Sequence, residues 1–190
     1  DTLVLSLLAI AAVVPLVGAT VNPNTGAGSW VCVSAPQSCT VSALGVAPNN
    51  VWMAAVGGAQ WIGPTSTSGL LEGPSPVGGI YVFELSLAGY DPISVFSFQM
   101  AADNGAKLEF VTTTGTVMIL EIPQPFNQQN GEGFLIGVSA SGVALIPPTA
   151  LRVTVFNEPS GGPTPSGFFL SGSVQALAEP EPATWTMFIL

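Results

Sequence analysis

Chemically reactive side chains are few in this 190-residue sequence. It contains no histidine, two cysteines, two basic residues and eleven acidic residues, for a formal net charge of −9. Without histidine the chain cannot form a Ser-His-Asp or Cys-His catalytic unit. It also lacks a histidine-containing zinc site, and two cysteines are too few for a four-cysteine one. The basic residues, Lys107 and Arg152, cannot neutralise a run of phosphates, which argues against binding to nucleic acids or anionic membranes.

Cys32 and Cys39 enclose a loop of hairpin size. We predict that they form a disulfide after export, because disulfides persist in oxidising compartments. Closing so short a loop contributes about 2 to 3 kcal/mol to stability in the chain-entropy account. A reactive thiol is the alternative, but the sequence places no His or Lys near either cysteine to stabilise a thiolate.

Two aromatic residues are candidate ligand-binding groups. Trp61 lies in residues 57–79, a stretch rich in Gly, Ser, Thr and Pro that is typical of a long surface loop. An exposed indole there can stack on the apolar face of a sugar ring, and burial in the core is the alternative. Tyr90, at a turn, is a weaker candidate of the same kind. Trp52 belongs to the strand-like run 51–56 and is expected in the core.

Acidic side chains offer two further hypotheses. Asp103 and Asn104, followed by Gly105, are typical of a turn, and the alternative is a pair of Ca²⁺ ligands that needs oxygens from other loops. We therefore predict no bound metal or cofactor, while a structural Ca²⁺ stays compatible with the sequence. Glu84 and Glu109 fall in strand-like segments. Paired carboxylates can hydrolyse glycosides, but carboxylates of a strand that face solvent are ordinary, so we predict no catalytic residues.

Short segments of alternating polarity must position these residues. The 22 glycines and 17 prolines favour many turns over long helices. Apolar and polar residues alternate with the period of two that is typical of strands. The candidate strands are Ile80–Leu87, Ile93–Met100, Leu108–Thr112, Thr116–Ile122, Gly133–Val138, Ala150–Phe156 and Gly167–Val174. The sequence therefore predicts an all-β domain over residues 20–178, an antiparallel β-sandwich or jelly roll.

Both ends of the chain have the pattern of targeting segments. The apolar run Leu3–Val17, with small residues at Val17 and Ala19, predicts a signal-peptide helix over residues 1–19 and cleavage after Ala19. Its basic start and the initial Met are missing, so we expect the sequence to be truncated there. At the other end, Trp185 stands at the start of an apolar run that is expected to begin a transmembrane helix and to be cut short.

A motif in the C-terminal segment resembles a known sorting signal. Pro180-Glu181-Pro182-Ala183-Thr184-Trp185 is similar to the opening of a PEP-CTERM signal, which is found on exported proteins of Gram-negative bacteria. That signal consists of a Pro-Glu-Pro motif, a transmembrane helix and a basic cluster, and the cluster is absent here. The resemblance implies an exosortase and the export machinery as partners, with transient anchoring in the membrane over residues 179–190.

The middle of the chain carries a second resemblance, to a galactose-binding-like jelly-roll domain common among PEP-CTERM proteins. The resemblance covers Trp61–Ala176, roughly 115 residues, and five motifs within it match in order and spacing. The sequence departs from this pattern in two places. Ser86 stands where Asp is usual, and Thr113-Thr114-Gly115 replaces Leu-Asn-Gly. Any role of the family's Asn in that tripeptide is therefore not assigned to this chain. The matching motifs are Trp61-Ile62-Gly63-Pro64, Gly79–Phe83, Leu85–Pro92, Ala101–Asn104 and Pro148–Val153.

These observations predict an exported, non-enzymatic protein of the cell surface or extracellular matrix, processed through the sorting signal. The alternative is a carbohydrate-binding module for a surface or matrix polysaccharide, with Trp61, Tyr90, Asp103 and Asn104 as candidate ligand-binding residues. An acidic domain with two basic residues does not adhere to anionic polymers by charge. Either function therefore depends on neutral contacts.

Overall fold

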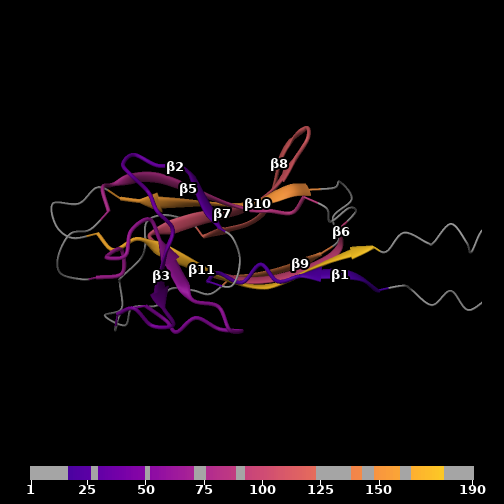
Figure 1. Cartoon of the computed structure of the whole chain (residues 1–190), viewed down its shortest axis with the longest axis horizontal. Helices are drawn as coiled ribbons and strands as arrows, with labels where there is room; N and C mark the ends of the chain where they lie inside the picture. The colour runs from indigo at the N-terminus through magenta and orange to yellow at the C-terminus, as the bar shows by residue number, and fades with distance from the viewer. Residues whose placement is uncertain are drawn as a thin grey trace, which may run out of the picture.

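The computed structural model describes residues 17–26, 30–49, 52–70, 76–88, 93–122, 138–142, 148–158 and 164–177. In these residues eleven strands form two antiparallel sheets that stack as two layers, and no helix is present (Figure 1). The described residues thus contain no helix that is long and apolar enough to cross a membrane. The predicted β-sandwich is confirmed. Tyr90, most of the predicted signal peptide and the whole sorting motif lie outside the described residues.

Sheet A has the strand order β3-β4-β11-β6-β9, and β1 also pairs with β11. The long strands β6 and β11 form its centre and pair over almost their whole length, from Gly167 opposite Asp103 to Ala176 opposite Ile93. The strands are β1 (Val17–Val21), β3 (Ser42–Gly45), β4 (Trp61–Gly63), β6 (Ile93–Asp103), β9 (Val138–Gly142) and β11 (Gly167–Leu177).

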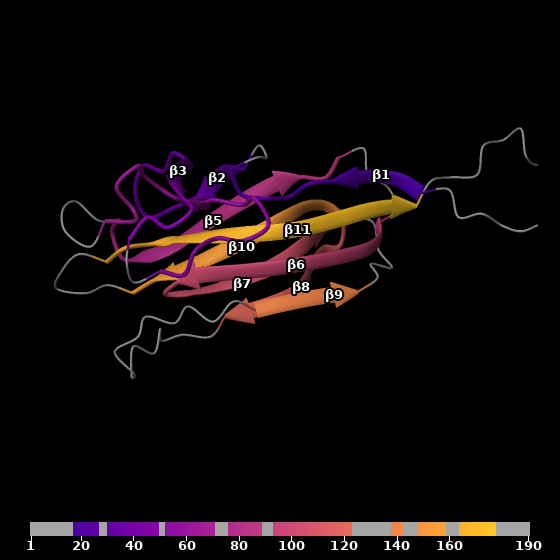
Figure 2. The same ribbon diagram turned by 90° about the horizontal axis from the view of Figure 1, so that it is seen from below.

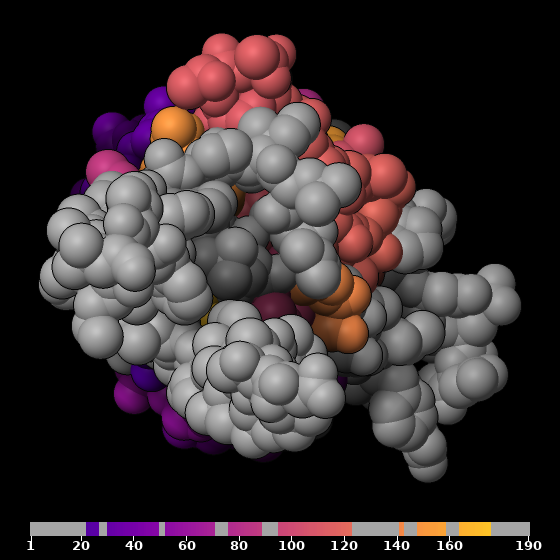
Figure 3. Space-filling view, turned by 90° about the vertical axis from the view of Figure 1, so that its right-hand side faces the viewer, coloured from indigo at the N-terminus to yellow at the C-terminus, as the bar shows by residue number. Residues whose placement is uncertain are grey.

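Sheet B has the order β2-β5-β10-β7-β8, with β10 at its centre. Seen from the end at which β1 and β11 lead to the two termini, the hairpin of β7 and β8 projects at the top of the molecule (Figure 3). The strands are β2 (Val31–Ser34), β5 (Gly79–Ser86), β7 (Gly105–Thr112), β8 (Gly115–Ile122) and β10 (Pro148–Asn157).

The main core lies between the two sheets, and the alternation of the sequence explains it. In β5, Tyr81, Phe83 and Leu85 are buried, while their neighbours are more exposed. The same period of two holds in β7 and β10, whereas parts of β6 and β11 are buried on both faces. The largest fully buried side chains of this core are Tyr81, Phe83, Phe98, Phe168, Ile62, Leu87, Met100, Leu108 and Leu151.

One edge of β11 is completed by a segment that is not a strand. Between its pairings with β4 and β1, β11 is bonded by Asn24 and Thr25. The Leu170 amide donates to Thr25 Oγ1 (3.1 Å), and the Gly172 amide donates to Asn24 Oδ1 (2.9 Å). Asn24 Nδ2 also donates to the Gly57 carbonyl at 2.7 Å. Two short polar side chains thus satisfy the backbone of β11 and tie the segment before β4 to it.

Three differences from the sequence-based prediction concern the candidate site residues and the predicted signal peptide. The described residues 52–56 do not form a strand. Residues 57–79 are not simply a surface loop, because the fully buried strand β4 lies within them. Strand β1 begins at Val17, so the predicted cleavage after Ala19 falls inside a strand that pairs with β11. In the first two cases local composition was overridden by packing against sheet A.

Candidate functional site

Trp61, the main candidate for sugar stacking, is buried and offers no face to a ligand. Its ring is 0% exposed, stacks on Trp52 at a centroid distance of 4.2 Å and meets Phe169 edge-on at 5.2 Å. Its Nε1 donates to the Met53 carbonyl at 2.9 Å. The interpretation as a ligand-binding aromatic is therefore wrong, and the alternative, a core residue, is correct. Trp52 is buried as predicted.

These rings form a second, small core on the outer face of sheet A. The segment between β3 and β4 lies across this face, as Figure 2 shows from below. Its Trp52 and Ala59 cover Phe169 of β11 and Ala101 of β6, and Trp61 lies among them. We call this region the covered part of sheet A. It explains why Trp61, although it lies in a stretch rich in Gly, Ser, Thr and Pro, is buried together with Trp52.

Asp103 lies at the edge of the covered part and is committed to internal bonds. Its Oδ2 accepts from Trp52 Nε1 at 2.8 Å. The Asn104 amide, oriented to satisfy its neighbours, donates to Asp103 Oδ1 at 2.7 Å and accepts from the Glu158 amide at 3.1 Å. Burial raises the pKa of Asp103 to about 6, and the Trp52 hydrogen bond opposes this rise. Asp103 is the last residue of β6, and Asn104 alone, as a bend, connects it to β7 in the other sheet, so the predicted turn is a one-residue crossing between the sheets.

The Ca²⁺ hypothesis for Asp103 and Asn104 finds no further ligands. The described residues contain no group of three or more His, Cys, Asp or Glu side chains placed to hold a metal ion. Asp103 is 7% exposed, and both of its oxygens face donors of the protein. A carboxylate already bonded in this way does not present the oxygen that a Ca²⁺ ion requires.

A two-glycine turn marks where the covered part ends. Gly57 and Gly58 have φ values of +62° and +78°, and the Ala59 amide donates to the Val56 carbonyl at 3.0 Å. Two successive positive φ values define a type I′ turn, which favours glycine at both central positions. A Cβ on Gly57 would lie 2.1 Å from Ser171 Oγ of β11. Glycine therefore lets the turn approach β11 directly.

Beyond this turn the outer face of sheet A carries a different set of side chains, which we call the polar face. Its members come from the three neighbouring strands β11, β6 and β9. Alternation turns them away from the core, since Phe98 and Val174 beside them are buried. The members are Ser97, Gln99, Ser141, Ser173 and Gln175. All are exposed except Ser173, which is half-buried.

The strand register places the polar face in rows across the sheet. Ser173, Ser97 and Ser141 are direct partners on β11, β6 and β9. Gln99 is the partner of Ser171, beside the glycine turn, and Gln175 is the partner of Val95, a 47% exposed side chain on the same face. Adjacent strands lie about 4.8 Å apart, so one row presents hydroxyl groups at a regular spacing on a rigid support.

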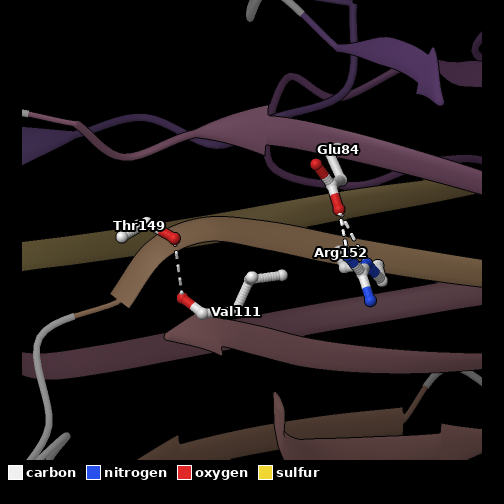
Figure 4. A network of polar contacts seen from close by, with 4 residues as sticks. All are labelled: Glu84, Val111, Thr149 and Arg152. Carbon is white, nitrogen blue, oxygen red and sulfur yellow. Dashed lines mark hydrogen bonds and ion pairs between the residues drawn. The ribbon is translucent and has the colours of Figure 1, made fainter. Parts of the chain in front are cut away.

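The outer face of sheet B has the opposite character. Arg152 of β10 has Glu84 of β5 as its partner on one side and Glu109 of β7 on the other. Its Nε and Nη2 lie 2.7 and 2.5 Å from Glu84 Oε1, and Thr149 nearby donates to the Val111 carbonyl (Figure 4). Glu84 is thus held by an ion pair, which removes it as a free carboxylate for hydrolysis.

Two other features of the structure, a disulfide and a small pocket, do not form a better ligand site. The Cys32–Cys39 disulfide is present, with Cα atoms 6.1 Å apart, as predicted from the sequence. A pocket of about 230 Å³ lies beside β3, lined by Gly26, Trp30, Val41, Ala43 and Ile62. It is smaller than typical ligand sites and its described lining offers no polar side chain for orienting a ligand. The polar face is therefore the better candidate.

The polar face was not found by the sequence analysis. Alternation already placed Ser97 and Gln99 of β6 on one side of their strand. What the sequence could not show is that β11 and β9 flank β6 and bring Ser173 and Ser141 into its row. Such pairing joins residues more than forty positions apart, and no local pattern specifies it.

Comparison with known proteins gives only distant structural similarity. No family model matches the chain, and no curated protein matches it. Among solved structures, a family 29 carbohydrate-binding module is 10% identical with a TM-score of 0.45, over 88% of this chain and 97% of that chain. A mutant complexed with cellulohexaose has the same identity and TM-score, over 86% and 94%. One complexed with mannohexaose is 10% identical with a TM-score of 0.44, over 86% and 99%. TM-scores below 0.5 do not establish a shared fold.

Proposed function

We propose that this chain is a non-enzymatic, carbohydrate-binding module of an exported protein. The observation that carries the proposal is the polar face, where five neutral side chains from three adjacent strands point outward in register. Serine hydroxyls and glutamine amides both donate and accept hydrogen bonds, as sugar hydroxyls do. Val95, on the same face, adds an aliphatic surface for the C–H groups of a sugar ring.

The rigidity of the support strengthens this assignment. The polar face belongs to long, paired strands whose other side chains fill the main core, so its groups are fixed before a ligand arrives. Preorganised groups lose less entropy on binding than groups on a loose chain. The polar face has no aromatic member, so we expect modest affinity built from several hydrogen bonds, each contributing about 1 kcal/mol.

Export is the second part of the proposal, and the disulfide supports it. A Cys32–Cys39 bond is typical of proteins that fold outside the reducing cytoplasm. The signal peptide, the PEP-CTERM signal and processing by an exosortase stay predictions from the sequence. These predictions imply a domain at the cell surface or in the extracellular matrix. We propose that polysaccharides of that environment are its ligands.

The binding part is tested with immobilised and soluble polysaccharides. We expect the wild-type chain to be retarded in native gels that contain a bound polysaccharide. The triple variant Ser97→Ala, Gln99→Ala, Ser173→Ala should bind at least about tenfold more weakly, because it loses three hydrogen-bonding groups. A matched control on the outer face of sheet B is Ser34→Ala, Ser86→Ala, Thr154→Ala, which should bind like the wild type. Equal weakening by both triple variants would contradict the assignment of the site.

The export part is tested in a host with and without its exosortase. Replacing Pro180, Glu181 and Pro182 by alanine should leave the full-length protein uncleaved and bound to the membrane. Mass spectrometry of the exported wild type should show a start at Thr20; a start before Val17 would show that β1 is kept whole and that the predicted cleavage site is wrong. Sorting of the alanine variant like the wild type would refute the role of the motif.

A further inference from the structure

The polar face is free of charge because of the composition of its strands. Of the residues in β1, β6, β9 and β11, only Asp103 is charged. Asp103 lies under Trp52 in the covered part and is 7% exposed. A ligand on the polar face therefore meets hydroxyl, amide and aliphatic groups, with no cation to pair with an acidic sugar.

Both basic residues of the chain lie on the other side of the sandwich. Lys107 and Arg152 project from the outer face of sheet B, on the neighbouring strands β7 and β10. Each is already paired with an acid: Lys107 Nζ lies 3.5 Å from Glu121 Oε1, and Arg152 is bonded to Glu84. Two packed sheets, about 10 Å apart between their planes, separate these cations from the polar face.

The remaining charge of the protein repels anions. The net charge is −9, so the protein as a whole repels an anionic polymer, and salt screens this repulsion beyond the Debye length. A neutral polar face on a protein of negative net charge should therefore favour uncharged ligands over anionic ones. We infer that the polar face takes an uncharged polysaccharide and discriminates against polymers that carry carboxylate or sulfate groups. This inference rests on the proposed function and names the class of its ligand.

The experiment compares polymers that share a backbone and differ in charge. Hydroxyethyl cellulose and carboxymethyl cellulose form one pair, and dextran and carboxymethyl dextran another. We expect retardation by at least one neutral polymer and at least tenfold weaker binding of its anionic counterpart at 10 mM salt, where the Debye length is about 30 Å. Raising the salt to 1 M should leave neutral binding within about twofold, since no counterions are released.

A charge placed on the polar face sharpens the test. Ser97→Lys puts a cation at the centre of the Ser173, Ser97, Ser141 row and should raise the affinity for the anionic polymer of the pair, in a way that salt reverses. Ser97→Gln has a similar reach without charge and should not. Thr154→Lys, on the outer face of sheet B, is the matched control and should leave the ratio of the two affinities unchanged within about twofold.

The outcomes separate the inference from the function on which it rests. Binding of an anionic polymer as tight as that of its neutral counterpart, lost in the polar-face triple variant, would overturn the inference and leave the carbohydrate site standing. Absence of binding to every neutral and anionic polymer of the panel would overturn the proposed function, and the inference with it.

Discussion

The two outer faces of the sandwich are covered by different kinds of side chains. Sheet B carries ion pairs on its surface, Arg152 with Glu84 and Lys107 with Glu121, beside half-buried and exposed aliphatic side chains. Sheet A has no ion pair on its described outer face. It buries one part under Trp52 and Trp61 and leaves the other part neutral and polar. The polar face of sheet A is neither covered by another segment of the described residues nor occupied by ion pairs. The comparison therefore points to it as the surface that can bind a ligand.

Removing the covered part should have the largest effect. Trp61→Ala deletes a ring that is 0% exposed, stacked on Trp52 and edge-on to Phe169, so we expect a loss of about 3 to 5 kcal/mol in the free energy of unfolding. Denaturant unfolding measures it. Phe156→Ala, a half-buried ring on the outer face of sheet B, is the control and should cost clearly less. An equal loss in both variants would show that the covered part is no true core.

Asp103, which lies beneath the covered part of sheet A, should make the free energy of unfolding depend on pH. The pKa of Asp103 rises from 3.8 in the unfolded chain to about 6 in the folded one. The folded state therefore holds this proton to higher pH, and the stability it contributes is complete below about pH 3.8 and lost as the pH rises through 6. Two pKa units correspond to about 3 kcal/mol, which we take as the upper limit.

Asp103→Asn removes this titration and keeps an oxygen for Trp52 Nε1. We expect the variant to gain stability relative to the wild type between pH 4 and pH 7, by up to about 3 kcal/mol, with a constant difference above pH 7. Urea unfolding at a series of pH values measures the difference. Glu109→Gln, on the opposite outer face, is the matched control. Parallel pH curves for wild type and Asp103→Asn would contradict the effect of burial.

Breaking the ion pair of sheet B should have a smaller effect. Arg152→Met removes the cation between Glu84 and Glu109, and the pair is partly exposed, at 32% and 23% for the two side chains. We expect a loss of about 1 kcal/mol that shrinks in 1 M salt. Lys107→Met breaks a longer and more exposed pair and should cost only a few tenths of a kcal/mol. The reverse order would show that exposure does not govern these pairs.

The sequence predicted the strands better than it predicted the site, for physical reasons. Alternation is local, so the inward residues of β5, β6, β7 and β10 could be assigned directly, and the short Cys32–Cys39 loop made the disulfide predictable. Trp61 was misjudged because its neighbours are Gly, Ser and Thr, and only the packing of Trp52 on it reveals the second core. The polar face depends on the register of three distant strands, which alternation does not specify.

The polar face itself should contribute least to stability, which is the sharpest form of the comparison. Ser97→Ala and Gln99→Ala each remove an exposed polar group from the outer face of β6. We expect changes within about 0.5 kcal/mol in the free energy of unfolding, as for most surface substitutions. Alanine at these positions can even favour the folded state slightly, because a glutamine side chain loses rotamer freedom when it is ordered. A binding surface kept for function is expected to behave in this way, since the fold gains nothing from its hydroxyl and amide groups.

The measurement combines urea unfolding of the two single variants with their retardation in native gels that contain a neutral polysaccharide. Unchanged unfolding with weakened retardation would separate the function of this face from the stability of the fold. A loss above about 1 kcal/mol in either variant would mean that the polar face holds the sheet together, and its neutrality would then need a structural explanation.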